Sequence, residues 1–191
     1  ARPIGDGPAY REKLRLTQAV LRPDWQALEV GCGTGATAVE HAPHVARYVA
    51  TDVSSAMIDL ARKRCAESGV QNFECRVAGL QDLGGEGPVW DAVLALNILH
   101  LLEDPDAAIE QIYGMIKPGG VFVSSTGTLK DGLGWTRPLI WAMRLIGKAP
   151  FVNFLSGDDV RAAMIRAGFT IETCWRPKPR AALFIIARKP G

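Results

Sequence analysis

The stretch LEVGCGTGAT, residues 28–37, is an apolar run that breaks into three glycines within five residues. Glycines at Gly31, Gly33 and Gly35 suit a backbone that turns sharply or lets a ligand come close. A strand, a glycine turn and a helix in succession direct backbone N–H groups at the ligand. The spacing fits G-x-G-x-G and, with Ala36, the looser G-x-G-x-x-A of dinucleotide-binding proteins. The turn alone therefore leaves the ligand open, and a tight turn without a ligand remains an alternative.

Two carboxylates add to this pattern. Glu29 lies two residues before Gly31 inside an otherwise apolar strand. Because a buried, unpaired carboxylate is costly, Glu29 needs a hydrogen-bond donor or a cation beside it. Asp52 ends the next apolar run, where a carboxylate can accept both hydroxyls of a ribose. The alternative for Asp52 is an acid at the start of the following helix.

Length and composition set the class of protein. The 191 residues fit one domain, 1–191, and the net charge of +2 with no basic block argues against a nucleic-acid partner. The four cysteines form no C-x-x-C pair and read as small apolar residues in a reducing compartment. No apolar run reaches membrane-spanning length and no signal-peptide pattern is visible. We expect a cytoplasmic protein with a small-molecule partner and no metal.

Strands alternate with helices along the chain. Strands are expected at 26–31, 46–52, 72–77, 89–97 and 119–125, and a closing strand pair at FTIETCW and ALFIIAR. Ser54 is expected to cap a helix whose inner face carries Met57, Leu60, Ala61 and Cys65, and residues 117–120 to form a tight turn into the fifth strand. This order predicts a parallel sheet covered on both faces, with its ligand beyond the carboxyl ends of the strands.

Four stretches, in order, resemble the class I S-adenosylmethionine (SAM)-dependent methyltransferases: LEVGCGTG, ATDVSSAMIDLAR, WDAVLALNILHLLEDPDAAIEQI and IKPGGVFVSS. The resemblance covers roughly residues 10–125. It implies a Rossmann-like, doubly wound α/β sheet of seven strands in order 3-2-1-4-5-7-6, with strand 7 antiparallel. It also implies an enzyme that transfers a methyl group from SAM to a small-molecule acceptor. Two alternatives stay open: an NAD(P)-dependent oxidoreductase, and a non-catalytic partner subunit with the methyltransferase fold.

The resemblance also assigns cofactor contacts. Gly31 and Gly33 would lie beside the methionine part of SAM, Asp52 would hold the ribose, and Met57 would pack on adenine unless it is a core residue. Where relatives often carry an acidic residue for the adenine amino group, this chain has Gly79, so backbone near Leu80 or the side chain of Asp82 would replace it. The full predicted set is Glu29, Gly31, Cys32, Gly33, Gly35, Asp52, Val53, Met57, Gly79, Leu80, Asn97 and Tyr10.

Methyl transfer to an activated carbon needs alignment first and a base only where the acceptor must lose a proton. His100, which follows the fourth strand with Asn97, is the candidate base, and a hydrogen-bonded structural histidine is the alternative. Tyr10 and Lys13 lie in a leader helix that can close over the cofactor or simply shield the sheet. His41 and His44 are expected at the surface.

Residues 126–155 form an insertion that is too long for a simple connection. Its apolar residues demand burial, and a short amphipathic helix is expected at 138–146. The apolar face of this helix could pack against the active-site mouth, a second subunit in a homodimer, or a membrane surface. We do not expect attachment to a membrane. We predict a lid over the acceptor, with Trp135, Trp141 and Phe154 contacting an apolar or aromatic body.

Overall fold

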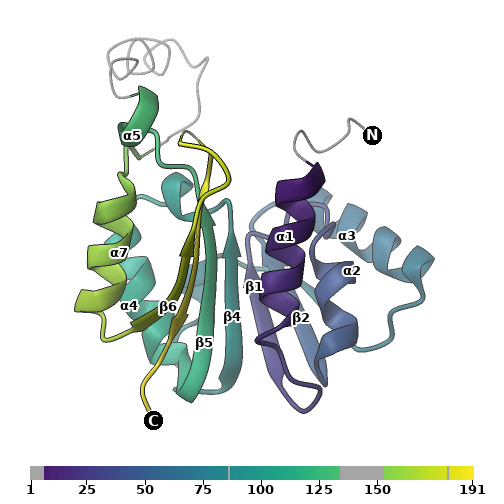
Figure 1. The fold of residues 1–191 in the computed structure, drawn as a ribbon. Helices are drawn as coiled ribbons and strands as arrows, with labels where there is room; N and C mark the ends of the chain where they lie inside the picture. Colours follow the sequence, from purple (N-terminus) through teal and green to yellow (C-terminus); the bar gives the residue numbers. More distant parts are fainter. Residues whose placement is uncertain (1–6, 86, 134–152, 180) are drawn as a thin grey trace.

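The protein folds around one seven-stranded sheet (Figure 1). The structure, a computed structural model, describes residues 7–85, 87–133, 153–179 and 181–191. The strand order is β3-β2-β1-β4-β5-β7-β6, with β7 antiparallel to both of its neighbours. This confirms the predicted fold class. The strands are β1 (Gln26–Val30), β2 (Arg47–Asp52), β3 (Phe73–Val77), β4 (Trp90–Leu96), β5 (Ile116–Thr126), β6 (Thr170–Trp175) and β7 (Leu183–Arg188).

Helices cover both faces of the sheet, as Figure 1 shows. One face carries α1 (Gly7–Gln18), α2 (Ala38–His41) and α3 (Ser55–Ser68), and the other carries α4 (Pro105–Met115) and α7 (Gly157–Arg166). A short helix, α5 (Lys130–Leu133), follows β5 at the upper edge of the view. Each face has its own apolar core, centred on Tyr48 and Phe184 beneath α1–α3 and on Phe122 and Ile112 beneath α4 and α7.

Local sequence signals set most helix ends. Ser54 Oγ accepts a hydrogen bond from the Met57 N–H at the start of α3, and Gly69 ends that helix in the left-handed conformation. Asp104 caps α4 ahead of Pro105. Ser156 and Asp159 form a capping box at α7. Among the described residues, no helix has the length and apolarity needed to cross a membrane.

The inner face of α3 was predicted correctly at two of its four expected residues. Ile58, Ala61 and Cys65 are buried, whereas Met57 is 39% exposed and Leu60 is 50% exposed. Ala61 and Cys65 of the expected stripe are thus buried as predicted, and Ile58 is buried in place of Met57 and Leu60. The Met57 side chain is therefore accessible to a ligand at the carboxyl edge of the sheet.

Residues 117–120 do not form a tight turn but belong to β5. Trp90 pairs with Ile116 and Ala92 pairs with Val121, so the extra residues bulge out of the β4–β5 ladder. Hydrogen bonds from the Gly119 N–H to Lys189 O, and from the Lys189 N–H to Gly120 O, keep this bulge in register with the chain after β7. The ladder on the β7 side, which is distant in sequence, thus decides the conformation.

Two expected surface or core assignments are reversed. His41 is 1% exposed on α2, the helix against which α1 packs (Figure 1), whereas His44 is exposed as expected. Cys174 is exposed rather than apolar core, while Cys32 and Cys65 are buried.

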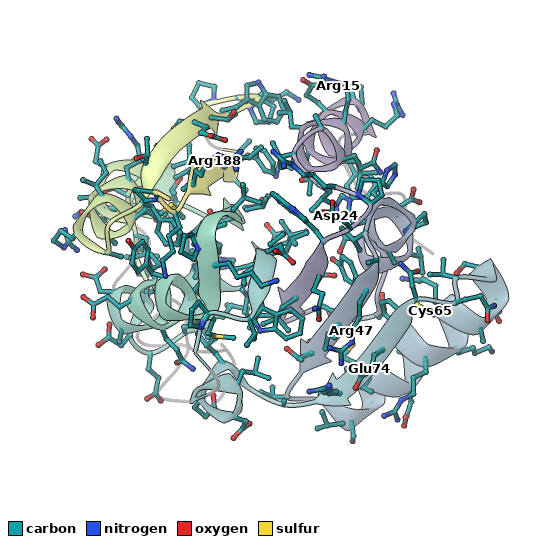
Figure 2. All side chains as sticks on the ribbon, turned by 90° about the horizontal axis from the view of Figure 1, so that it is seen from below. Arg15, Asp24, Arg47, Cys65, Glu74 and Arg188 are labelled. Carbon is teal, nitrogen blue, oxygen red and sulfur yellow. The ribbon has the colours of Figure 1, made fainter. Side chains whose placement is uncertain are left out.

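The lower edge of the sheet holds surface ion pairs. Figure 2 looks from below, where Arg47 on β2 and Glu74 on β3 lie side by side with Nη2 and Oε2 2.7 Å apart. The carboxyl ends of β1, β2, β4 and β5 lie at the opposite edge, where the sequence places the ligand.

Candidate cofactor and acceptor site

The glycine turn after β1 has one open position. All three glycines have positive φ, at 70°, 53° and 71° for Gly31, Gly33 and Gly35. A Cβ at Gly31 would lie 2.8 Å from the Ile98 side chain, and a Cβ at Gly35 would lie 3.0 Å from the Ala61 Cβ. A Cβ at Gly33 would meet no atom within 4 Å. Gly31 and Gly35 thus allow close packing within the protein, and Gly33 is the one that faces open space.

Asp52 holds this turn to the end of β2. Its Oδ2 accepts a hydrogen bond from the Gly33 N–H at 2.9 Å, and its Oδ1 accepts one from the Ser54 N–H at 2.9 Å. Each carboxylate oxygen has a second lone pair, so two ribose hydroxyls can still donate to it. The half-buried carboxylate therefore lies beside the open glycine, as the sequence predicted for a ribose contact. Cys32 adds a backbone bond from its N–H to Thr51 O at 2.9 Å.

Glu29 is buried, with 1% exposure, and finds its partners in two hydroxyls. Thr37 Oγ1 donates to Oε1 at 2.7 Å, and the Tyr48 hydroxyl donates to Oε2 at 2.9 Å. Burial raises the pKa of Glu29 to about 7, and the two hydroxyl donors pull in the opposite direction. The hydrogen-bond donors that Glu29 was expected to need are therefore present. They connect the start of α2 and strand β2 to the strand that leads into the glycine turn.

The side chains predicted to contact adenine follow Asp52 in the chain and differ in their exposure. Val53 is 72% exposed and Met57 is 39% exposed at the start of α3, so Met57 is not a core residue. Leu80 is buried, with 7% of its surface exposed. The Gly79 N–H donates a hydrogen bond to Asp82 Oδ2 at 2.8 Å. Asp82 therefore has one carboxylate oxygen engaged in its own loop.

Asn97 and Ser125 connect the ends of β4 and β5. Asn97 has φ 62°, and no other non-glycine residue in the described part of the chain has a positive φ. Its N–H donates to Ser125 O at 2.6 Å, and the Ser125 hydroxyl donates to Asn97 Oδ1 at 3.3 Å. Lys13 Nζ reaches across from α1 and donates to Ser125 Oγ at 2.8 Å. Left-handed backbone is uncommon at non-glycine residues, and asparagine is among those that adopt it most readily.

His100 lies in a short 3₁₀ turn at Leu99–Leu101, half-buried beside Gly127. Its Nδ1 is buried and has no hydrogen-bond partner among the residues described. Burial lowers the pKa of the imidazole, which favours the neutral form that a base requires. Its carbonyl oxygen accepts from the Asn153 N–H at 2.7 Å, so the chain returning from the 126–155 insertion is attached here.

The predicted lid residues lie mostly beyond what is described. Trp135, Trp141 and the expected helix at 138–146 lie outside the described residues. Phe154 is described and is half-buried close to Asn153. Across the described ranges, no group of three His, Cys, Asp or Glu side chains is arranged to hold a metal ion.

A pocket of about 290 Å³ opens between α1 and the ends of β4 and β5. Tyr10, predicted to contact the cofactor, lines it together with Lys13, Asn97, Ser125 and His41. Burial raises the pKa of the Tyr10 phenol, which keeps this hydroxyl protonated.

Three contributors to the site were missed from the sequence. Tyr48 could have been found, because in a parallel pair Ala27 opposes Tyr48 and the side chains of Glu29 and Tyr48 then share a face. Thr37 could have been found as the hydroxyl at the start of α2. Ser125 could not, because its partner Lys13 is 112 residues away and nothing local marks the pair.

Comparisons with known proteins agree with this geometry. A family model for a methyltransferase domain matches residues 28–122. A ubiquinone biosynthesis O-methyltransferase of Xylella fastidiosa is 30% identical over 77% of this chain and 61% of its own length. One of Xanthomonas campestris is 35% identical over 56% of this chain and 45% of its own length. The chain thus spans about half to three-fifths of these curated relatives.

Solved structures share the fold. A putative SAM-dependent methyltransferase of Listeria monocytogenes superposes with a TM-score of 0.79 at 16% identity, covering 97% of this chain and 100% of that one. The N-methyltransferase NodS of Bradyrhizobium japonicum, in complex with S-adenosylhomocysteine (SAH), gives 0.71 at 20% identity, covering 96% and 87%. Together with the sequence matches, these findings show that the chain belongs to the class I SAM-dependent methyltransferase family.

Proposed function

We propose that this protein transfers a methyl group from SAM to an oxygen of a small molecule. The observation that carries the proposal is the open face at Gly33, held against the Asp52 carboxylate at the carboxyl ends of β1 and β2. The O-methyltransferase names of the relatives support oxygen as the acceptor atom. Because the chain spans only part of the length of those relatives, their activity is a proposal for this chain.

The residues present fit SAM better than a dinucleotide. SAM has no phosphate, and only one glycine of the turn faces open space, whereas a pyrophosphate is bound along several backbone N–H groups. Asp52 would hold the ribose, and Met57, Val53 and Leu80 would contact the adenine. When bound, SAM supplies an electrophilic methyl carbon on a sulfonium. Nothing in the geometry favours the NAD(P)-dependent alternative.

We propose His100 as the base that accepts a proton from the acceptor hydroxyl. Burial lowers the pKa of its imidazole, and it follows the end of β4 three residues after Asn97. Removal of this one group is expected to slow transfer by about 10²–10⁴-fold, the range typical of general-base catalysis. A structural histidine beside Gly127 would instead change stability without changing the pH profile of turnover.

We further propose that the 126–155 insertion covers the acceptor. The support is that its described end returns to His100, where the Asn153 backbone bonds to the His100 carbonyl and the Asn153 side chain donates to Leu102 O. Trp141→Ala is then expected to reduce turnover far more than it reduces affinity for SAM. Equal losses of turnover and affinity, or a change in oligomeric state on sedimentation, would assign the segment to the fold or to a homodimer interface.

We propose that the protein is a cytoplasmic enzyme that acts without a nucleic-acid partner. The near-neutral net charge of +2 and the absence of disulfides among the described cysteines support it. Fractionation of the native host, followed by detection of the protein in soluble and membrane fractions, tests the location directly.

The activity itself is tested by incubating the protein and radiolabelled SAM with fractionated metabolite extracts. The proposal predicts label in a small molecule and its loss in the Asp52→Ala variant. Tight SAM binding without label in any fraction would instead favour a non-catalytic partner subunit.

A further inference from the structure

The glycine turn has little conformational restriction of its own. Residues 31–35 contain three glycines, and glycine loses more backbone freedom on folding than any other residue. The Gly35 N–H donates to Cys32 O at 3.0 Å, so a β-turn joins these two residues. Gly33 and Thr34 are its central residues, and of these two Gly33 has the positive φ, at 53°. Contacts from other segments must therefore hold this turn in one conformation for Gly33 to present a fixed face to a ligand.

Arg64 on α3 holds the second central residue of this turn. Its Nη1 donates to the Thr34 carbonyl oxygen at 2.9 Å and to Thr34 Oγ1 at 2.8 Å, from 30 residues further along the chain. Arg62, two residues earlier, instead pairs with Asp59 of its own helix. Arg64 is partly buried, and hydrogen bonds from a charged donor are stronger than those between neutral groups. Thr34 is thus fixed through both its backbone and its side chain.

The turn is also packed directly on α3. A Cβ at Gly35 would lie 3.0 Å from the Ala61 Cβ, and Ala61 precedes Arg64 by three residues, so both lie on the same side of the helix. The Asp52 carboxylate, just before α3, accepts the Gly33 N–H at 2.9 Å. Two consecutive residues of the turn are therefore anchored by charged side chains of opposite sign, the first by Asp52 and the second by Arg64.

The direction of these bonds limits how the turn can move. The Thr34 carbonyl oxygen accepts from Arg64, and the N–H of the same peptide group, that of Gly35, donates to Cys32 O. Rotation of this peptide group would break a hydrogen bond at each end. A Cβ at Gly33 would still meet no atom within 4 Å, so the Arg64 side chain does not fill the open face. Arg64 thus restrains the turn and leaves its ligand-facing side open.

We propose that Arg64 is a positioning residue for cofactor binding, which holds the turn in the conformation that receives SAM. It acts through Thr34 and not by contact with the cofactor. Apparent affinity falls with the fraction of molecules whose turn is in the binding conformation, so an arginine that keeps this fraction high strengthens binding without a contact of its own. The inference rests on the proposed function and adds to it the source of the turn's rigidity.

The first test compares Arg64→Met with Arg62→Met, read by calorimetry with SAH. Both variants remove a guanidinium from α3, and Arg62 also donates to a backbone oxygen of another segment, that of Cys75 on β3, at 3.3 Å. Arg64→Met is expected to weaken SAH binding by about fivefold or more, whereas Arg62→Met is expected to leave the Kd within about twofold. A wild-type Kd in Arg64→Met, or equal weakening in both variants, would overturn the proposal.

Arg64→Lys separates a hydrogen-bonding role from general support of the helix. One nitrogen, Nη1, makes both bonds to Thr34, and a lysine ammonium carries three donors on one nitrogen. Arg64→Lys is therefore expected to restore most of the SAH affinity that Arg64→Met loses. Thr34→Val, which removes the hydroxyl and keeps the carbonyl, is expected to lose less affinity than Arg64→Met. Equal losses in Arg64→Lys and Arg64→Met would contradict the proposal.

Amide hydrogen exchange in the free chain tests the turn without a ligand. The Gly35 N–H, bonded to Cys32 O, is expected to exchange faster in Arg64→Met than in the wild type. The Gly119 N–H, bonded to Lys189 O at 2.9 Å, is the internal control and is expected to stay unchanged. Unchanged exchange at Gly35 together with weaker SAH binding would mean that Arg64 acts on the cofactor directly, and the proposal would fail while the proposed function stands. If the wild-type chain binds no SAH, the proposed function fails, and exchange at Gly35 still decides whether Arg64 orders the turn.

Discussion

At the scale of single residues, a comparison of Gly33 with Gly69 separates two effects of a substitution, the strain that it causes in the backbone and the access of the ligand that it blocks. Gly33 and Gly69 both have positive φ, and a Cβ at either would meet nothing within 4 Å. Gly33→Val and Gly69→Val are therefore expected to destabilise the fold by a similar amount, about 1–2 kcal/mol. Only Gly33→Val is expected to abolish SAH binding in calorimetry. Normal binding by Gly33→Val would make the turn purely structural.

Asp52 carries a prediction of its own. Its carboxylate orders the Gly33 and Ser54 N–H groups and is proposed to accept the ribose hydroxyls. Each charge-assisted bond is worth about 1.5–3 kcal/mol, so Asp52→Ala is expected to weaken SAH binding by more than tenfold. Asp59→Ala, which removes an exposed carboxylate from α3, is the control and is expected to bind normally. An unchanged Kd in Asp52→Ala would refute the role.

Glu29 makes stability depend on pH. Its pKa in the folded protein is about 7, above its ordinary value of 4.5, so the folded state holds the proton more tightly. The stability linked to this proton is full below pH 4.5 and is lost as pH rises through 7, by at most about 3 kcal/mol. The unfolding free energy of the wild type minus that of Glu29→Gln is expected to fall by that amount across this window in denaturant unfolding. The difference between variants is the quantity to measure, because burial lowers the pKa of His41 to about 4 and adds an opposing rise in stability over the same pH range. Glu67→Gln is expected to follow the wild type, and a constant difference between the wild type and Glu29→Gln would contradict the assignment.

At the scale of elements, the capping box of α7 offers a test of local sequence signals. Ser156 Oγ accepts from the Asp159 N–H at 3.1 Å, and Asp159 accepts from the Ser156 N–H in return. Ser156→Ala is expected to cost about 1 kcal/mol in chemical denaturation, because one N–H of the first turn loses its partner. SAH affinity is expected to stay unchanged. A loss of binding in this variant would mean that α7 positions the site.

The elements also show where sequence reasoning ends. Caps at Ser54, Asp104 and Ser156 were predictable because each depends on residues within one helical turn. The bulge at 117–120 and the burial of His41 were not, because the chain after β7 decides the first and the packing of other elements against α2 decides the second. Local chemistry thus predicted where elements begin, and long-range packing decided which surfaces they present.

At the scale of the whole molecule, the same division separates the two halves of the site. The glycine turn, Glu29 and Asp52 are short-range features of one strand–turn–helix unit, and the sequence predicted them as a group. The Lys13–Ser125 contact and the pocket between α1 and the ends of β4 and β5 are different. They are formed by segments that only the complete sheet brings together. The sheet order was predicted through the family resemblance, since element order alone allows more than one arrangement.

The open face at Gly33 and Asp52 is proposed to receive the adenosyl cofactor. Titration calorimetry of the wild-type chain with SAM, SAH and NADH tests it most directly. SAM and SAH are expected to bind one molecule per chain at micromolar Kd, and NADH is expected to show no heat of binding. Tight NADH binding with no response to SAM or SAH would contradict it.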